Sequence, residues 1–245
     1  MTTEGGVPTS SLSNEVHPDL LRPRVPGRVR VDCHTHTCYS GDAVTTIEEF
    51  AAQLESLALD VVCVTDHHSV RGAYELRALG LSTRIVIGEE IRSREGEIIG
   101  LFLHERISPG MSLADTVQAI REQGGVTYVP HPFDPARRPL RTDALYAACA
   151  NGWIDVIEVF NAKTADPNDN SRARDCADTF GVGMGAGSDA HDRRAIGAAY
   201  VELSDFDDPQ SFLDAFVSAE TFGQHFDPPR EWTPRVIPKN LRPSS

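Results

Sequence analysis

Five short polar motifs, each directly after an apolar run, constrain the fold of this chain more than any other feature of its sequence. They occupy residues 32–42 (DCHTHTCYSGD), 65–68 (TDHH), 88–90 (GEE), 130–132 (PHP) and 187–191 (GSDAH). Continuous apolar runs such as residues 60–65 are typical of strands buried on both faces of a parallel sheet. Functional residues of such sheets gather at the carboxyl ends of the strands, so we expect the five motifs to form one site.

Helical patterns separate the apolar runs. We expect strands at 29–32, 60–65, 84–87, 97–103, 126–129, 153–160, 182–187 and 198–203, with helices at 45–57, 72–79, 112–123, 140–151, 168–180 and 209–219. Thr45 and Glu48 have the spacing of a capping box at the start of the first helix. The alternation predicts an α/β fold with a mostly parallel sheet, although the short turn before residue 97 predicts one antiparallel pair.

The ends of the chain differ in composition from its middle. Residues 1–28 contain Pro, Ser and Gly and predict a flexible arm. Residues 29–225 predict a single domain, and residues 226–245 predict a proline-rich tail that lies extended over the surface.

Charge and cysteine content narrow the class of protein. The net charge of −13 makes the chain a poor binder of polyanions, so long nucleic acid is not expected as a partner. The N-terminus does not resemble a signal peptide, and no apolar run reaches the roughly 18 residues of a membrane span. Five irregularly spaced cysteines predict reduced thiols in a cytoplasmic protein. The oligomeric state stays open.

Two motifs place pairs of potential metal ligands two residues apart. His34 and His36 share one face if the strand continues through them, and Asp189 and His191 repeat this spacing. Imidazole and carboxylate together suit divalent metal ions, so we expect all four side chains to be ligands.

The other motifs leave alternatives open. One or two of Asp66, His67 and His68 are expected to be ligands, with Asp66 a candidate for orienting an imidazole. His131 lies between two prolines that fix its position, and we expect it to be a ligand. Of Glu89 and Glu90, one is expected to bind metal while the other is solvated.

Further polar residues follow these strands. Glu158 and Asn161 fit a structural polar network and a substrate contact equally well. Arg137 and Arg193 each follow a metal motif, and either is solvated or holds a substrate phosphate through the bidentate contacts that guanidinium favours.

Taken together, the motifs resemble the PHP (polymerase and histidinol phosphatase) family over residues 29–203. The matching stretches are His34–His36, Ser40–Asp42, Thr65–His67, Gly88–Glu90, His131–Pro132 and Gly187–His191. The resemblance implies a distorted (β/α)7 barrel that holds two or three divalent metal ions, with manganese, zinc and iron as candidates.

The resemblance also implies a ligand assignment. A first metal would be held by His34, His36, Glu90 and Asp189, a second by Glu90 and His131, and a third by Asp42, His67 and His191. Glu97 stands where the family usually has a histidine, and we expect it to be a ligand of the second metal. A carboxylate there would favour manganese, iron or magnesium over zinc.

The function that follows is a metal-dependent phosphoesterase acting on a small phosphorylated metabolite or nucleotide. A hydroxide between two metals would attack phosphorus, so that no Ser or Cys nucleophile is required. Catalysis is expected to depend on Asp189, His191 and Glu90, and substrate binding on Arg193, Arg137 and Asn161. The alternatives are an exonuclease or oligonucleotide phosphatase, a hydrolase of C–N bonds, and a non-catalytic regulatory domain.

Overall fold

A computed structural model describes residues 23–230 of the chain. Its strands are β1 (Arg28–Thr35), β2 (Val61–Val64), β3 (Arg84–Arg92), β4 (Glu97–Leu101), β5 (Val126–Val129), β6 (Val156–Asn161), β7 (Gly183–Gly187), β8 (Ala199–Ser204) and β9 (Glu220–Gly223). Its α-helices are α1 (Ile47–Ser56), α2 (Arg71–Ala78), α3 (Leu113–Glu122), α4 (Thr142–Ala150), α5 (Pro167–Phe180) and α6 (Pro209–Ala215), with 3-10 turns η2 (Arg193–Ala195) and η3 (Phe216–Ser218).

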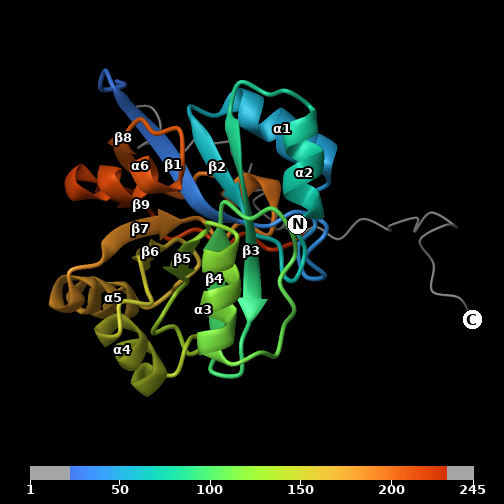
Figure 1. Cartoon of the computed structure of the whole chain (residues 1–245). Helices are drawn as coiled ribbons and strands as arrows, with labels where there is room; N and C mark the ends of the chain where they lie inside the picture. The colour runs from blue at the N-terminus through green and yellow to red at the C-terminus, as the bar shows by residue number, and fades with distance from the viewer. Residues whose placement is uncertain (1–22, 231–245) are drawn as a thin grey trace, which may run out of the picture.

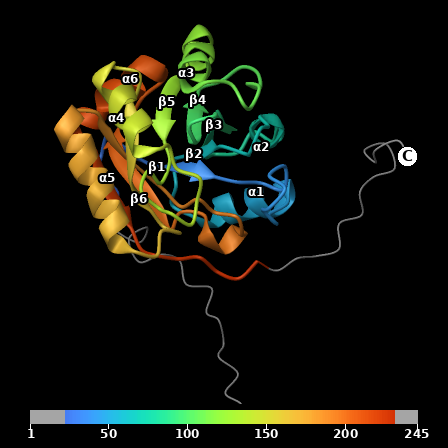
Figure 2. The ribbon, with the colours of Figure 1, turned by 90° about the horizontal axis from the view of Figure 1, so that it is seen from below.

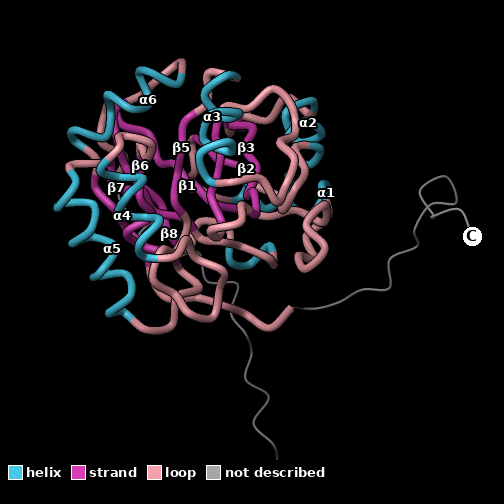
Figure 3. Tube along the Cα trace, turned by 60° about the horizontal axis from the view of Figure 1, so that its bottom comes forward, coloured by secondary structure: helices cyan, strands magenta, loops and turns pink. Residues whose placement is uncertain are grey.

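The nine strands form one sheet in the order β7-β6-β5-β4-β3-β2-β1-β8-β9. β1, β2 and β3 are parallel, as are β5, β6 and β7, whereas β4 is antiparallel to both its neighbours. The predicted antiparallel pairing of β3 with β4 is therefore confirmed. The sheet curls at the centre of the molecule, with helices around it (Figures 1 and 3).

The curled sheet nearly closes where β1 meets the end of β7. Backbone hydrogen bonds join Asp189 N to His34 O (2.7 Å) and His36 N to Ala190 O (3.0 Å). The buried carboxylate of Asp32 accepts hydrogen bonds from the backbone N–H groups of Ser188 and Gly197, both at 2.9 Å. These contacts hold two of the polar motifs together, because both motifs supply backbone groups to the seam.

The central strands are buried on both sides. Val62 and Val64 belong to a core shared with the helices, which contribute Phe50, Leu76, Ile120 and Leu145. Val61 and Cys63 belong to a second core that Phe212 of α6 completes. This two-sided burial explains why the strand sequences are continuously apolar.

The fold class is as expected, with three corrections of detail. The sheet has nine strands, namely the eight expected from the sequence and the unexpected β9, whereas the resemblance implied a barrel of seven; β8 and β9 extend the sheet in antiparallel pairing beside β1. The capping box of α1 uses Thr46 and Glu49, one residue later than predicted, since the Thr46 side chain accepts from Glu49 N. The last predicted helix ends at Ala215 and continues as the 3-10 turn η3.

The predicted arm and tail fall largely outside the described residues, at 1–22 and 231–245, and the domain boundaries stay a prediction. Within residues 23–230 no helix is long and apolar enough to cross a membrane.

Candidate metal centre

The histidines and carboxylates of the five motifs converge at one end of the sheet. Within the described residues, four groups place one potential ligand atom from each member within 4.8 Å of the others. The groups are His34–His36–Glu90, His34–His131–Asp189, His36–His67–His191 and His67–Glu90–Glu97. Because His34, His36, His67 and Glu90 each belong to two groups, the four groups form one cluster.

The H-x-H pair is buried, and each ring has a fixed partner at Nδ1. His34 Nδ1 lies 3.1 Å from Glu158 Oε1, and His36 Nδ1 lies 2.9 Å from Ser40 Oγ. Ser40 in turn donates to Asp66 Oδ1 at 2.8 Å, so its oxygen is free to accept from His36. In the neutral form that binds metal, these partners place the ring proton on Nδ1 in both residues and leave both Nε2 atoms as lone-pair donors.

Two buried carboxylates face these rings. Burial raises the pKa of Glu90, but attraction to His34 and His67 outweighs burial and holds it well below the usual value. For Asp189, burial is likewise outweighed, by the cations Lys163 and His34, and the pKa is well below normal. Both groups are therefore charged acceptors, which is the form that binds metal.

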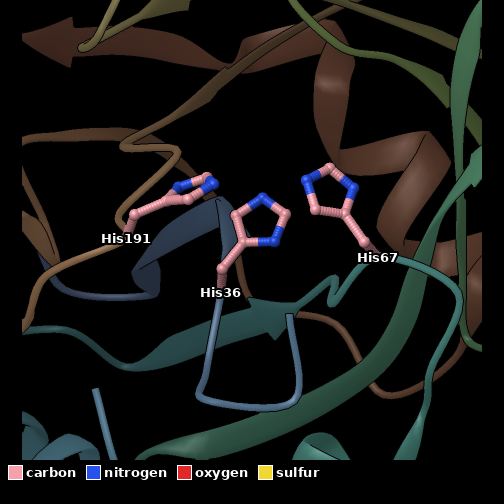
Figure 4. A group of neighbouring side chains, drawn as sticks. All are labelled: His36, His67 and His191. Carbon is pink, nitrogen blue, oxygen red and sulfur yellow. The ribbon is translucent and has the colours of Figure 1, made fainter. Parts of the chain in front are cut away.

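A third part of the cluster lies nearer to solvent. His36 lies between His191 and His67 (Figure 4), with ring centroids 4.3 and 4.7 Å away. Asp42 Oδ2 lies 3.2 Å from His191 Nε2 and 3.7 Å from His67 Nε2. Asp42, His67 and His191, which the resemblance assigns to a third metal, thus lie together.

His131 and Glu97 complete the cluster on the other side of Glu90. His131 Nε2 lies 3.2 Å from Glu90 Oε1. Glu97 is 5% exposed, which argues against a carboxylate facing solvent at the strand edge. Its burial raises its pKa, and repulsion from Glu90 adds to that effect. Arg92 offers one counter-charge, with its Nη2 at 3.6 Å.

The donor set fits divalent cations. The Nε2 atoms of His34 and His36 are 3.0 Å apart, so one cation could reach both of them. In the described part of the chain, His131 Nδ1 and Asp42 Oδ1 are buried without a hydrogen-bond partner. A mixture of imidazole and carboxylate suits zinc, iron and manganese alike.

Residues next to the cluster hold its histidines and carboxylates in place through hydrogen bonds. Glu158 accepts from Tyr128 Oη (3.1 Å), His131 N (2.7 Å) and Asn161 Nδ2 (2.9 Å), in addition to its contact with His34. The Asn161 amide also lies 3.4 Å from Asp189 Oδ2. These contacts favour a structural polar network for Glu158 and Asn161 over a substrate contact.

The prediction that Glu89 is solvated was wrong. Its side chain is fully buried and accepts a hydrogen bond from Ile107 N at 2.7 Å. Burial raises its pKa to about 7. Adjacent residues on a strand point to opposite faces, so Glu89 faces away from the site that Glu90 enters.

Basic residues border the cluster. Arg137 Nε lies 3.6 Å from Asp189 Oδ2, whereas Arg193 is exposed on η2. Sequence reasoning missed Lys163, whose buried Nζ lies 3.4 Å from Asp189 Oδ1 and 3.0 Å from His191 Nδ1. Its signal was present: Lys163 lies two residues beyond Asn161, the last residue of β6, in the same strand-end position as the other motifs.

Models of two described families match most of the chain. The family model described as PHP domain matches residues 32–177, and the model described as PHP-associated matches residues 167–221. An uncharacterized protein of Methanocaldococcus jannaschii is 37% identical, covering 56% of this chain and 85% of the relative. A probable phosphatase of Shewanella sp. strain ANA-3 is 28% identical, covering 68% of this chain and 78% of the relative.

The fold is also similar to that of a solved structure. A two-domain protein of Bacteroides vulgatus, containing a predicted PHP-like metal-dependent phosphoesterase, superposes with a TM-score of 0.66 at 17% identity. The alignment covers 82% of this chain and 67% of that protein.

Proposed function

The chain belongs to the PHP domain family, and on this premise we propose that it is a metal-dependent phosphoesterase acting on a small phosphorylated metabolite or nucleotide. One observation carries the proposal: four linked groups of histidines and carboxylates that could hold metal ions meet at the strand ends. The description of the Shewanella relative as a probable phosphatase supports the same reaction class.

We assign the metal ligands as follows. The first ion would be held by His34, His36, Glu90 and Asp189, the second by Glu90, His131 and Glu97, and the third by Asp42, His67 and His191. The contacts of His131 with Glu90 and of Asp42 with His191, both at 3.2 Å, support the second and third sets. Divalent ions bound there would lower the pKa of a water molecule and neutralise charge on the phosphoryl oxygens. Manganese, iron and zinc are the proposed metals.

The protein's own residues supply orientation and charge. Glu158 fixes the His34 ring through Nδ1, and Ser40 fixes His36 in the same way. Glu90 and Asp189 remain ionised because cationic groups surround them. Together with His191 they form the catalytic set of the proposal.

Substrate binding involves the arginines at the rim. Arg137 has a buried Nε without a hydrogen-bond partner among the described residues, so it has a donor to offer to a phosphoryl oxygen. Arg193 is exposed close in sequence to His191, and we propose that it meets the outer part of the substrate. Asn161 acts through Asp189 rather than by direct contact.

The experiment that tests the function begins with metal analysis of the purified protein. Metal-loaded protein is then assayed against phosphomonoesters, phosphodiesters, nucleotides and a short oligonucleotide. Turnover of small esters is the expected result. Turnover of the oligonucleotide alone would favour the nuclease alternative, and a fully loaded protein without activity on any of them would favour a regulatory domain.

A further inference from the structure

The C-terminal segment, residues 224–230, returns to the metal centre. Gln224 N donates to Ala198 O (3.0 Å) and Phe226 N donates to Ala162 O (2.8 Å), which anchors the segment beside Lys163. Further along, Pro229 O accepts from Arg194 Nη2 at 2.7 Å. In the view of Figure 2 the segment, in red, crosses below the ribbon from the side of α5 toward the side of α1. It is therefore tied to two loops of the site.

Arg230, the last residue that the structure describes, has a donor without a partner. Arg230 has a half-buried side chain, and its Nε is buried without a hydrogen-bond partner within residues 23–230. Arg137 Nε is in the same condition. Two unsatisfied guanidinium donors close to one site are uncommon, because buried polar groups are almost always hydrogen-bonded.

Lys163 shares a partner with Arg137, because both approach Asp189, with Nζ at 3.4 Å and Nε at 3.6 Å. Its side chain is 1% exposed, and a lysine this deeply buried is rare unless it is paired. Burial lowers the pKa of its ammonium group, Asp189 opposes the shift, and repulsion from Arg137 and Arg230 adds to the lowering. The segment that carries Arg230 passes beside Lys163, where Phe226 N donates to Ala162 O.

The acidic groups nearby do not satisfy this positive charge fully. Asp189 is assigned to a metal, and Asp134 lies 4.0 Å from Arg137 Nε while it accepts from Thr164 and from Ala136 N. Asp227 also acts on Arg137, but it is exposed. An anion on the substrate would complete the arrangement.

We propose that Arg137, Lys163 and Arg230 together bind the phosphoryl group of the substrate, and that segment 224–230 is therefore part of the active site. The inference rests on the proposed function and names its substrate class. A terminal phosphate carries about 1.5 to 2 negative charges at pH 7, whereas a diester carries a single one. Three cations match the monoester better, so the enzyme prefers phosphomonoesters.

The test uses the full-length, metal-loaded protein and two kinds of measurement. Calorimetry measures the affinity for inorganic phosphate, and steady-state kinetics compare p-nitrophenyl phosphate with bis(p-nitrophenyl) phosphate. The variants are Arg230→Gln, Lys163→Gln and the charge-preserving Lys163→Arg. Arg138→Gln is the matched control, because Arg138 is exposed beside Arg137 and has no place in the site.

Hydrogen bonds to charged groups contribute about 1.5–3 kcal/mol, which corresponds to a roughly 10- to 150-fold loss of phosphate affinity for Arg230→Gln and Lys163→Gln. We expect KM for the monoester to rise, the diester to change little, metal content to be retained, and Lys163→Arg to recover part of the affinity. The inference would be overturned if Arg230→Gln bound phosphate with the same affinity as the control Arg138→Gln. It would also be overturned if the variants lost bound metal in proportion to their loss of phosphate affinity.

The two proposals fail in different ways. If the wild type hydrolyses neither ester, yet Arg230→Gln weakens phosphate binding, the proposed function is wrong and the anion site stands. If the wild type hydrolyses the monoester and Arg230→Gln changes neither affinity nor KM, the anion site is wrong and the function stands.

Discussion

Replacing Glu158 by glutamine tests how the site is held together. Each carboxylate oxygen accepts from two donors: Oε1 from His34 and Tyr128, and Oε2 from the His131 backbone and Asn161. Glutamine keeps the shape but offers one acceptor and one NH2 group. The Oε2 side includes a rigid backbone donor at 2.7 Å, so the amide oxygen should remain there and the NH2 group should face His34.

The consequences differ for the two side chains facing the new NH2 group. Tyr128 can rotate its hydroxyl and accept. His34 must move its proton from Nδ1 to Nε2, which removes the lone pair that would bind metal. Losing such an orienting partner typically lowers metal affinity about 10- to 100-fold. The unfolding free energy of the metal-free protein should fall by about 1–3 kcal/mol, the cost of an imperfectly satisfied buried group.

The assay is competition for metal against a chromophoric chelator, together with denaturant unfolding in EDTA. Tyr128→Phe is the matched control, because it removes one donor to the same oxygen and leaves the His34 tautomer unchanged. It should lower the unfolding free energy by about 0.5–1.5 kcal/mol while metal affinity is retained. Equal metal affinity for Glu158→Gln and the wild type would refute the assigned tautomer and the role of Glu158.

Four other changes have clear expected results. Asp189→Asn should retain the circular dichroism of the wild type but lose bound metal. Its turnover should fall by more than the about 10- to 100-fold that is typical when a residue that only orients a metal ligand is replaced. Full metal content in this variant would show that Asp189 is not a ligand. Gly187→Ala puts a Cβ 2.4 Å from the His34 Cβ and should cost about 1–3 kcal/mol of unfolding free energy, whereas Gly41→Ala, with nothing within 4 Å, should be nearly neutral. Equal losses at the two glycines would contradict the packing argument. Glu97→Gln should lose one metal equivalent and shift the response to manganese and zinc, so identical metal profiles would remove Glu97 from the ligand set. Removing metal with a chelator should lower Tm by about 5–10 °C, because a ligand present at 100 times its Kd stabilises the folded state by about 2.7 kcal/mol. An unchanged Tm would mean that the cluster binds no metal.

The sequence predicted the fold where the signal was local. Apolar runs and capping residues identified β1 to β8 and all six α-helices, since each depends on neighbours within a few positions. β9 was missed because residues 220–223 contain only a short, half-exposed strand that forms by pairing with β8. The role of Asp32 was also hidden, because its partners Ser188 and Gly197 are more than 150 residues away.

In the candidate site, too, the residues with a local sequence signal could be predicted and those that depend on distant contacts could not. The potential ligands could be listed from the sequence because histidine and carboxylate at strand ends are chemically distinctive. Glu158 and Asn161 could not be separated from substrate contacts, since their role depends on hydrogen bonds to His34 and Asp189. Lys163 carried only the strand-end spacing as a signal, and a single lysine in a loop is usually a solvated charge. Arg230 depends on the return of the C-terminal segment, which no pattern in the sequence predicts.

The site also concentrates features that cost free energy unless cations are bound. Asp189 and His131 have φ angles of +49° and +29°, a region that residues other than glycine rarely adopt and that costs about 1–3 kcal/mol each. Glu90 and Glu97 are buried close enough for repulsion to raise the pKa of Glu97. A dication between these groups would turn the repulsion into attraction and offset the strained backbone. We therefore expect metal binding and folding to be coupled in this chain, because the residues that position the potential ligands are the ones whose conformation is least favourable without the metal.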